Sequence, residues 1–127
     1  IAYRQELVHG AAPAGGCESA MKILEAEPRV TALVACNDVN ALAAYGALRA
    51  RGLSVPKDVS VVGFDDVPAA LEVWPPLTTM RVDRVGMGRK AAQRLFQKLA
   101  EGNATSPHQI VFSAELVVRA STAAPRK

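Results

Sequence analysis

The sequence has few of the residues from which catalytic and metal sites are usually built. Its 127 residues include two cysteines, Cys17 and Cys36, and two histidines, His9 and His108, and none of them falls at the spacing of a metal-binding motif. Neither a GxSxG nucleophile turn nor a Gly-rich phosphate loop is present. The sequence therefore predicts a protein that is not an enzyme and that uses no metal or cofactor. Because both cysteines lie in apolar stretches, we expect buried free thiols.

Long apolar runs and a strong charge of one sign are also absent. No apolar run approaches the roughly 18 to 20 residues of a membrane-spanning helix. The 15 basic and 12 acidic residues leave a net charge of +3, which is too small and too scattered to indicate direct binding of nucleic acid. Half of the residues are apolar, enough for the core of one ordinary domain. The first residue is Ile1 rather than Met, so we expect a fragment of a longer protein.

The spacing of the apolar residues predicts alternating strands and helices. Strands are expected at residues 2–8, 30–36, 59–64, 109–112 and 115–119, and helices at residues 17–27, 38–51 and 83–100. Residues 9–16 are rich in Gly and Pro and predict a loop. The continuous apolar run 30–36 is typical of a strand covered on both faces. Short connections between these elements predict an α/β fold with a doubly wound parallel sheet and flanking helices.

Compact polar residues follow two of the expected strands. Asn37 and Asp38 follow the first apolar run, and Asp65 and Asp66 follow the second. In open α/β sheets, ligands bind outside the carboxyl ends of the strands, where an amide and a carboxylate can hold a polyhydroxyl ligand. The same residue types are also ordinary helix caps. In that interpretation Asp66 holds the following "VPAA" turn, and Asp38 complements the dipole of its helix.

Three segments of the sequence together resemble one family. They are "ACNDVNALAA", "VPKDVSVVGFDD" followed by "PPLTT", and "ELVVRAST". In this order they resemble the effector-binding core of lactose-repressor (LacI/GalR) family transcription regulators, from about Ala2 to Thr122. The resemblance implies a periplasmic-binding-protein-like region with flavodoxin-like topology, in which an effector binds between two similar subdomains. A periplasmic solute-binding protein of a sugar transport system is the alternative, but such proteins usually lack Asp66 and the Pro-Leu-Thr-Thr segment.

The resemblance also implies roles for individual residues. Asn37 and Asp65 match family positions that hydrogen-bond the effector. Val82 and Ala11 match pocket positions where sugar-binding members often carry a polar residue and an aromatic ring, so these two departures leave the effector class open. Leu42 and Trp74 match the dimer interface of the family.

The resemblance implies partners and a division of the chain. The partners are a small polar effector such as a sugar, a second copy of the chain, and operator DNA bound through a helix-turn-helix domain absent from this chain, in a cytoplasmic protein without a membrane partner. Residues 1–82 would belong to the C-terminal effector-binding subdomain, residues 83–108 to a crossover helix that packs on a missing N-terminal subdomain, and residues 109–127 to returning strands and a tail. With that subdomain missing, we expect the stripe of Leu95, Phe96 and Leu99 to drive self-association.

Overall fold

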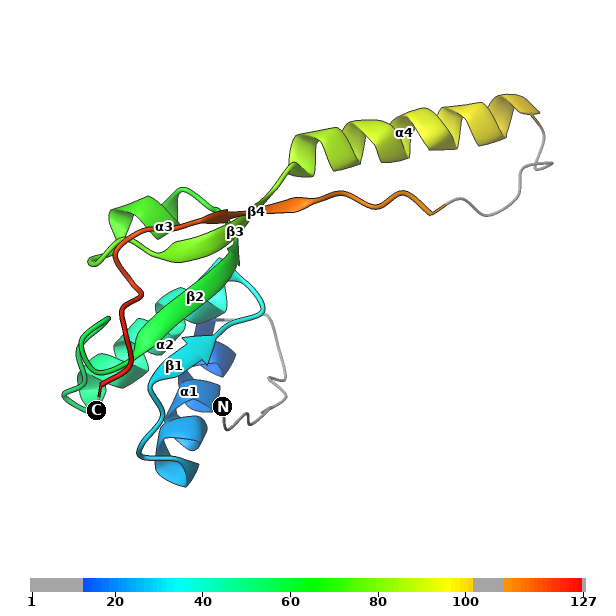
Figure 1. Ribbon diagram of the computed structural model, residues 1–127. Helices are drawn as coiled ribbons and strands as arrows, with labels where there is room; N and C mark the ends of the chain where they lie inside the picture. The colour runs from blue at the N-terminus through cyan, green and yellow to red at the C-terminus, as the bar shows by residue number, and fades with distance from the viewer. Residues whose placement is uncertain (1–12, 102–108, 127) are drawn as a thin grey trace.

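Figure 1 shows the computed structural model, which describes residues 13–101 and 109–126. The helices are α1 (Pro13–Ala26), α2 (Asp38–Ala50), α3 (Ala69–Glu72) and α4 (Arg84–Glu101), and the strands are β1 (Ala32–Val34), β2 (Ser60–Asp65), β3 (Thr78–Val82) and β4 (Ala114–Val117). The expected strand at residues 2–8 and the expected pocket position Ala11 lie outside the described residues.

The strands form one four-stranded sheet in the order β1-β2-β3-β4. The pairs β1–β2 and β2–β3 are parallel, whereas β4 pairs with β3 in the antiparallel direction. The expected α/β class with a mostly parallel sheet and flanking helices is confirmed. Two elements come where the residue patterns predicted no helix or strand: the short helix α3, and β3, whose threonines are buried.

The core lies between one face of the sheet and the helices α1 and α2, which pack against each other (Figure 1). Leu33 of β1 and Val61 of β2 point into this core and are buried. Val34, the next residue of β1, is 83% exposed, because successive side chains of a strand point to opposite faces. The expected cover on both faces of this strand is therefore wrong for the described part of the chain.

Helix α1 begins at Pro13, four residues before the expected start at Cys17. Proline is well suited to the first position of a helix, because its missing N–H would have no partner there. Residues 13–16 are therefore helical rather than part of a loop. A Cβ atom at Gly16 would lie 2.8 Å from Asn40 Oδ1 and 2.9 Å from Asn40 Cα, so the absence of a side chain lets α1 approach α2 closely.

Helix α4 lies beyond the end of the sheet, away from α1 and α2 (Figure 1). Asp83 caps it as expected, since its Oδ1 accepts a hydrogen bond of 2.8 Å from the backbone N–H of Gly86. The apolar stripe of Leu95, Phe96 and Leu99 is exposed, and self-association through it stays a prediction. The expected strand at residues 109–112 is wrong: pairing between β3 and β4 ends at Val82 and Ala114, where β3 gives way to α4.

The described helices include none that is long and apolar enough to cross a membrane.

Replacement of Gly63 by Ala is expected to destabilise the chain. A Cβ atom there would lie 2.2 Å from Asp38 Oδ1 and 3.0 Å from Leu77 Cδ2, and both neighbours are fully buried. We expect the free energy of unfolding to fall by about 3 kcal/mol, the upper range for overpacked cores. Gly46→Ala is the matched control, because no atom lies within 4 Å of its added Cβ on α2. That variant should gain up to about 1 kcal/mol in urea denaturation; equal stability of the two variants would contradict the packing argument.

Candidate ligand-binding site

The carboxyl ends of the three parallel strands bring three of the expected site residues to one edge of the sheet. Asp65 is the last residue of β2, and Val82 is the last residue of β3. Val34 of β1 pairs with Val62 of β2 in the parallel register. Asn37 and Asp65 each lie three residues further on from this pair, so they come at the same end of the two strands. Because neighbouring strands lie about 4.8 Å apart, this edge can present all three residues to one small ligand.

Asn37 is the N-cap of α2. Its backbone is extended, with φ −156° and ψ 168°, and its side-chain Oδ1 accepts a hydrogen bond of 2.8 Å from the backbone N–H of Asn40. The capping interpretation is therefore confirmed for this residue. The cap uses only the amide oxygen, so the Nδ2 group can still donate to a ligand.

Asp65 has an unusual backbone and an unengaged carboxylate. Its φ is 113° and that of Asp66 is 53°, both in a region that residues other than glycine rarely adopt. Asp65 is partly exposed, and its side chain makes no hydrogen bond or ion pair with the described residues. A carboxylate at a strand end with no protein partner is able to accept hydrogen bonds from ligand hydroxyls.

Asp38 carries the structural role that the sequence suggested for Asp66. It lies in the first turn of α2 as expected, but it is fully buried. Its Oδ2 accepts a hydrogen bond of 2.9 Å from the backbone N–H of Val67, and its Oδ1 accepts one of 2.5 Å from the hydroxyl of Thr79. Asp38 thereby holds the turn that follows β2, and the prediction that Asp66 holds this turn is wrong. The start of α2 lies beside the carboxyl end of β2, so Asp38 rather than Asp66 reaches the turn.

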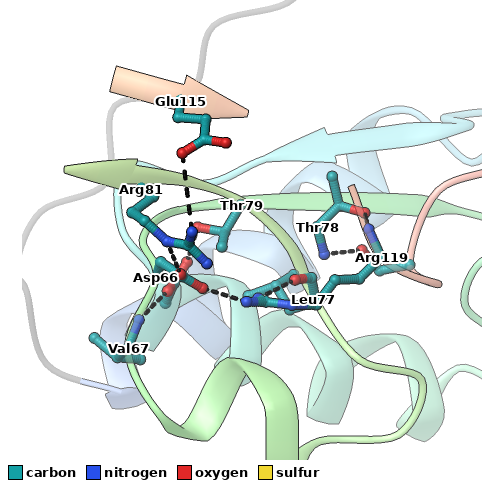
Figure 2. Close-up of polar contacts among 10 residues, drawn as sticks. Asp66, Val67, Leu77, Thr78, Thr79, Arg81, Glu115 and Arg119 are labelled. Atoms are coloured by element: carbon teal, nitrogen blue, oxygen red, sulfur yellow. Dashed lines mark hydrogen bonds and ion pairs between the residues drawn. The ribbon is translucent and has the colours of Figure 1, made fainter. Parts of the chain in front are cut away.

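Asp66 is instead the centre of an ion-pair cluster (Figure 2). Arg81 of β3 donates from Nε to its Oδ2 at 2.6 Å, and Arg119 donates from a terminal guanidinium nitrogen to its Oδ1. Arg119 is itself held, because its other terminal nitrogen donates to the carbonyl of Leu77 at 2.8 Å. Arg81 also lies 3.8 Å from a carboxylate oxygen of Glu115 on β4.

This cluster lowers the pKa of Asp66. Burial alone would raise the pKa, since the side chain is only 11% exposed, but the hydrogen bonds and positive charges of Arg119 and Arg81 outweigh burial. The carboxylate is therefore charged throughout the physiological range. Residue patterns did not identify Arg81 or Arg119 as its partners. The only available signal was the position of Arg119 within the "ELVVRAST" segment.

The two expected interface residues lie on α2 and just after α3. Leu42 is partly buried on α2 and packs against the core, whereas Trp74 follows α3 and is 86% exposed. Tyr45, one turn after Leu42, donates a hydrogen bond of 3.0 Å to the carbonyl of Pro75. Burial raises the pKa of Tyr45, so the hydroxyl remains a neutral donor at physiological pH. This bond ties α2 to the turn that carries Trp74.

Other candidate groups do not assemble into a site. Cys36 is exposed rather than buried as expected, and its sulfur accepts a hydrogen bond of 3.1 Å from Asn40 Nδ2. Cys17 is partly buried and free. Within residues 13–101 and 109–126, no group of three His, Cys, Asp or Glu side chains could hold a metal ion. A groove of about 530 Å³ lies between α4 and residues 110–112, and its described lining does not include Asn37, Asp65 or Val82.

Acid should remove the stabilisation that Asp66 provides. A pKa lowered below the ordinary 3.8 means that the contribution is complete above that pH and is lost as pH falls through the lower folded-state pKa. The midpoint of urea unfolding should therefore drop more steeply below about pH 4 in the natural chain than in Asp66→Asn, whose side chain cannot ionise. Circular dichroism is the suitable signal, because Trp74 is already exposed in the folded state. Parallel pH profiles of the two proteins would contradict the role of the cluster.

Comparison with known proteins agrees with the fold. The family of periplasmic binding protein-like domains matches residues 2–122. The chain is 50% identical over 94 residues to the HTH-type transcriptional regulator MalR of Streptomyces coelicolor, a match that covers 73% of this chain and 27% of that protein.

Two solved structures share the fold. One is a complex of the transcriptional regulator CelR with cellobiose, at a TM-score of 0.83 and 36% identity, over 87% of this chain and 34% of that one. The other is the lac repressor dimer bound to operator and the anti-inducer ONPF, at a TM-score of 0.77 and 34% identity, over 89% of this chain and 39% of that one. The chain thus spans about a quarter to two fifths of the length of these relatives. It belongs to the periplasmic binding protein-like domain family and represents the effector-binding region of the LacI/GalR type.

Proposed function

We propose that this chain senses a small polar molecule such as a sugar and passes the signal to an operator-binding domain of a larger, dimeric, cytoplasmic regulator. The observation that carries the proposal is the unengaged carboxylate of Asp65, which shares the carboxyl edge of the parallel strands with Asn37. The similarity to MalR and to the cellobiose complex of CelR supports this assignment. Transport is not favoured as the alternative, because these relatives are transcriptional regulators.

In the proposed site, each edge residue contributes a different contact. Asp65 accepts hydrogen bonds from ligand hydroxyls, and the Nδ2 group of Asn37 donates to a ligand oxygen. Val82 offers an apolar contact to the C–H face of a ring. An uncharged, hydroxyl-bearing effector fits this set best, since Arg81 already engages Asp66. Ala11, the fourth expected position, lies outside the described residues.

The proposed response is a population shift. An effector that contacts both this edge and the facing subdomain binds the closed arrangement more tightly than the open one, and it therefore favours closure. Strand β3 leads directly into α4, the expected crossover helix, which begins two residues after β3 ends. Closure would therefore change the position of α4 relative to the sheet, and with it the spacing of the DNA-binding domains in the dimer.

The proposed dimer interface contains Leu42 and Trp74. Trp74 is a large aromatic side chain exposed to solvent, and Leu71 on the neighbouring helix α3 is exposed as well. Aromatic residues are enriched in the centres of protein interfaces. The structure of the lac repressor dimer, which shares this fold, supports a dimer in the present family member.

Asp65→Ala should abolish the effector response of the complete regulator while operator binding and dimerisation persist. Loss of charge-assisted hydrogen bonds to the effector should weaken its binding by about 10-fold to 100-fold. The measurement is operator binding by fluorescence anisotropy during titration with mono- and disaccharides, with cellobiose tried first. Asp58→Ala is a control, because Asp58 lies in the turn after α2 and pairs with Arg126 rather than with the edge. A normal response in Asp65→Ala would remove Asp65 from the site.

Trp74→Glu should convert the dimer into a folded monomer. A carboxylate in the centre of an apolar interface loses its hydration without gaining a partner, which costs several kcal/mol. Light scattering would report the mass, and circular dichroism would show that the fold is retained. Ala124→Glu is the control, since it adds the same charge at an exposed position near the end of the described chain. A dimer that persists in Trp74→Glu would place the interface elsewhere.

A further inference from the structure

The backbone conformation at the end of β2, at residues 65 and 66 (the corner), is not explained by the local sequence. Asp65 and Asp66 are consecutive, neither is glycine, and both have positive φ. Such conformations are costly and persist only where the surrounding structure determines them. On one side, Asp38 accepts a hydrogen bond from the backbone N–H of Val67 and holds the outgoing chain. On the other side, strand pairing of Asp65 with Arg81 holds the incoming chain, so the conformation of Asp66 is left to other groups.

The ion-pair cluster supplies the second set of restraints. Both oxygens of the Asp66 carboxylate are engaged, one by Arg81 and the other by Arg119 (Figure 2). Arg119 is only 10% exposed, and its backbone N–H also donates to the hydroxyl of Thr78 at 2.9 Å. Asp66 is therefore tied to β3 and to the segment after β4, while the side chain of the adjacent Asp65 makes no hydrogen bond or ion pair within the described part of the chain. With both oxygens occupied, Asp66 has little capacity left to contact a ligand.

We propose that Asp66 is a positioning residue for the effector site: through Arg81 and Arg119 it holds the corner in the conformation that presents Asp65 to the ligand. The inference rests on the proposed function of Asp65. When Asp66 is neutralised, the corner samples other backbone conformations. Because apparent affinity falls in proportion to the fraction of molecules in the competent conformation, effector binding weakens although no direct contact is lost.

The first experiment tests the restraint without any ligand. In the complete regulator, hydrogen exchange measured by mass spectrometry should show that the amides of residues 64–67 exchange about tenfold faster in Asp66→Asn, the lower end expected for loss of hydrogen bonds to charged groups. Asp58→Asn is the matched control: it makes the same chemical change in an aspartate that also pairs with an arginine, Arg126, and accepts a hydrogen bond from the N–H of Ser54. Because the Asn side chain could still accept a hydrogen bond from one of the two arginines, Asp66→Ala repeats the test with both hydrogen bonds removed.

The second experiment separates positioning from general stability. The probe is the sugar that changes operator binding in the Asp65 experiment, with cellobiose first, titrated by calorimetry at a temperature where every variant is folded. Asp66→Asn should weaken binding of the probe about tenfold in the natural background. In the Asp65→Ala background the same change should have no further effect, because the group that it positions is gone.

The outcomes distinguish this proposal from the proposed function. Exchange at residues 64–67 that is unchanged in both Asp66 variants would overturn the restraint, whatever the ligand results. Equal, additive losses of affinity in the two backgrounds would overturn positioning and indicate a general structural role. A normal effector response in Asp65→Ala would instead contradict the proposed function itself. In that case, faster exchange in Asp66→Asn would still show a restraint on the backbone. Because that restraint would serve no effector contact at Asp65, the positioning proposal would be overturned as well.

Discussion

The buried carboxylate of Asp38 is the contact on which the arrangement of the site depends. It joins the first turn of α2 to Thr79 on β3 and to the backbone of Val67 after β2. Leaving either donor without a partner in this buried place would cost about 1–3 kcal/mol. The close approach of Asp38 to β2 is possible because residue 63 is glycine, so a single glycine and a single aspartate together set the height of the helix above the sheet.

The corner between β2 and α3 combines a strained backbone with restraints on both sides. Asp38 holds the chain after the corner, and Asp66 ties it to Arg81 and Arg119. Between them, the side chain of Asp65 has no hydrogen-bond or ion-pair partner among the described residues. A free carboxylate in a fixed place is what a binding site requires, because the protein bears the cost of orientation before the ligand arrives.

The edge of the candidate ligand site is continuous with α4. Arg81 lies one residue before the end of β3, and α4 begins two residues after β3 ends. Glu115 of the returning strand lies 3.8 Å from Arg81. In the proposed response, a change in the position of α4 would act on β3, which carries Arg81, a partner of Asp66. The proposed response would therefore pass between α4 and the candidate site along β3 rather than through the core.

The sequence by itself determined the class of the fold, the order of most elements and the edge at which Asn37 and Asp65 meet, because apolar periodicity and strand-end chemistry are local properties. The caps at Asn37 and Asp83 were predictable for the same reason. Only the tertiary structure decided that Asp38 rather than Asp66 holds the turn, that Cys36 is exposed, and that Arg119 reaches Asp66 across 53 residues of chain. Such pairings depend on helix height and strand register, which packing of distant segments sets and which no local pattern encodes.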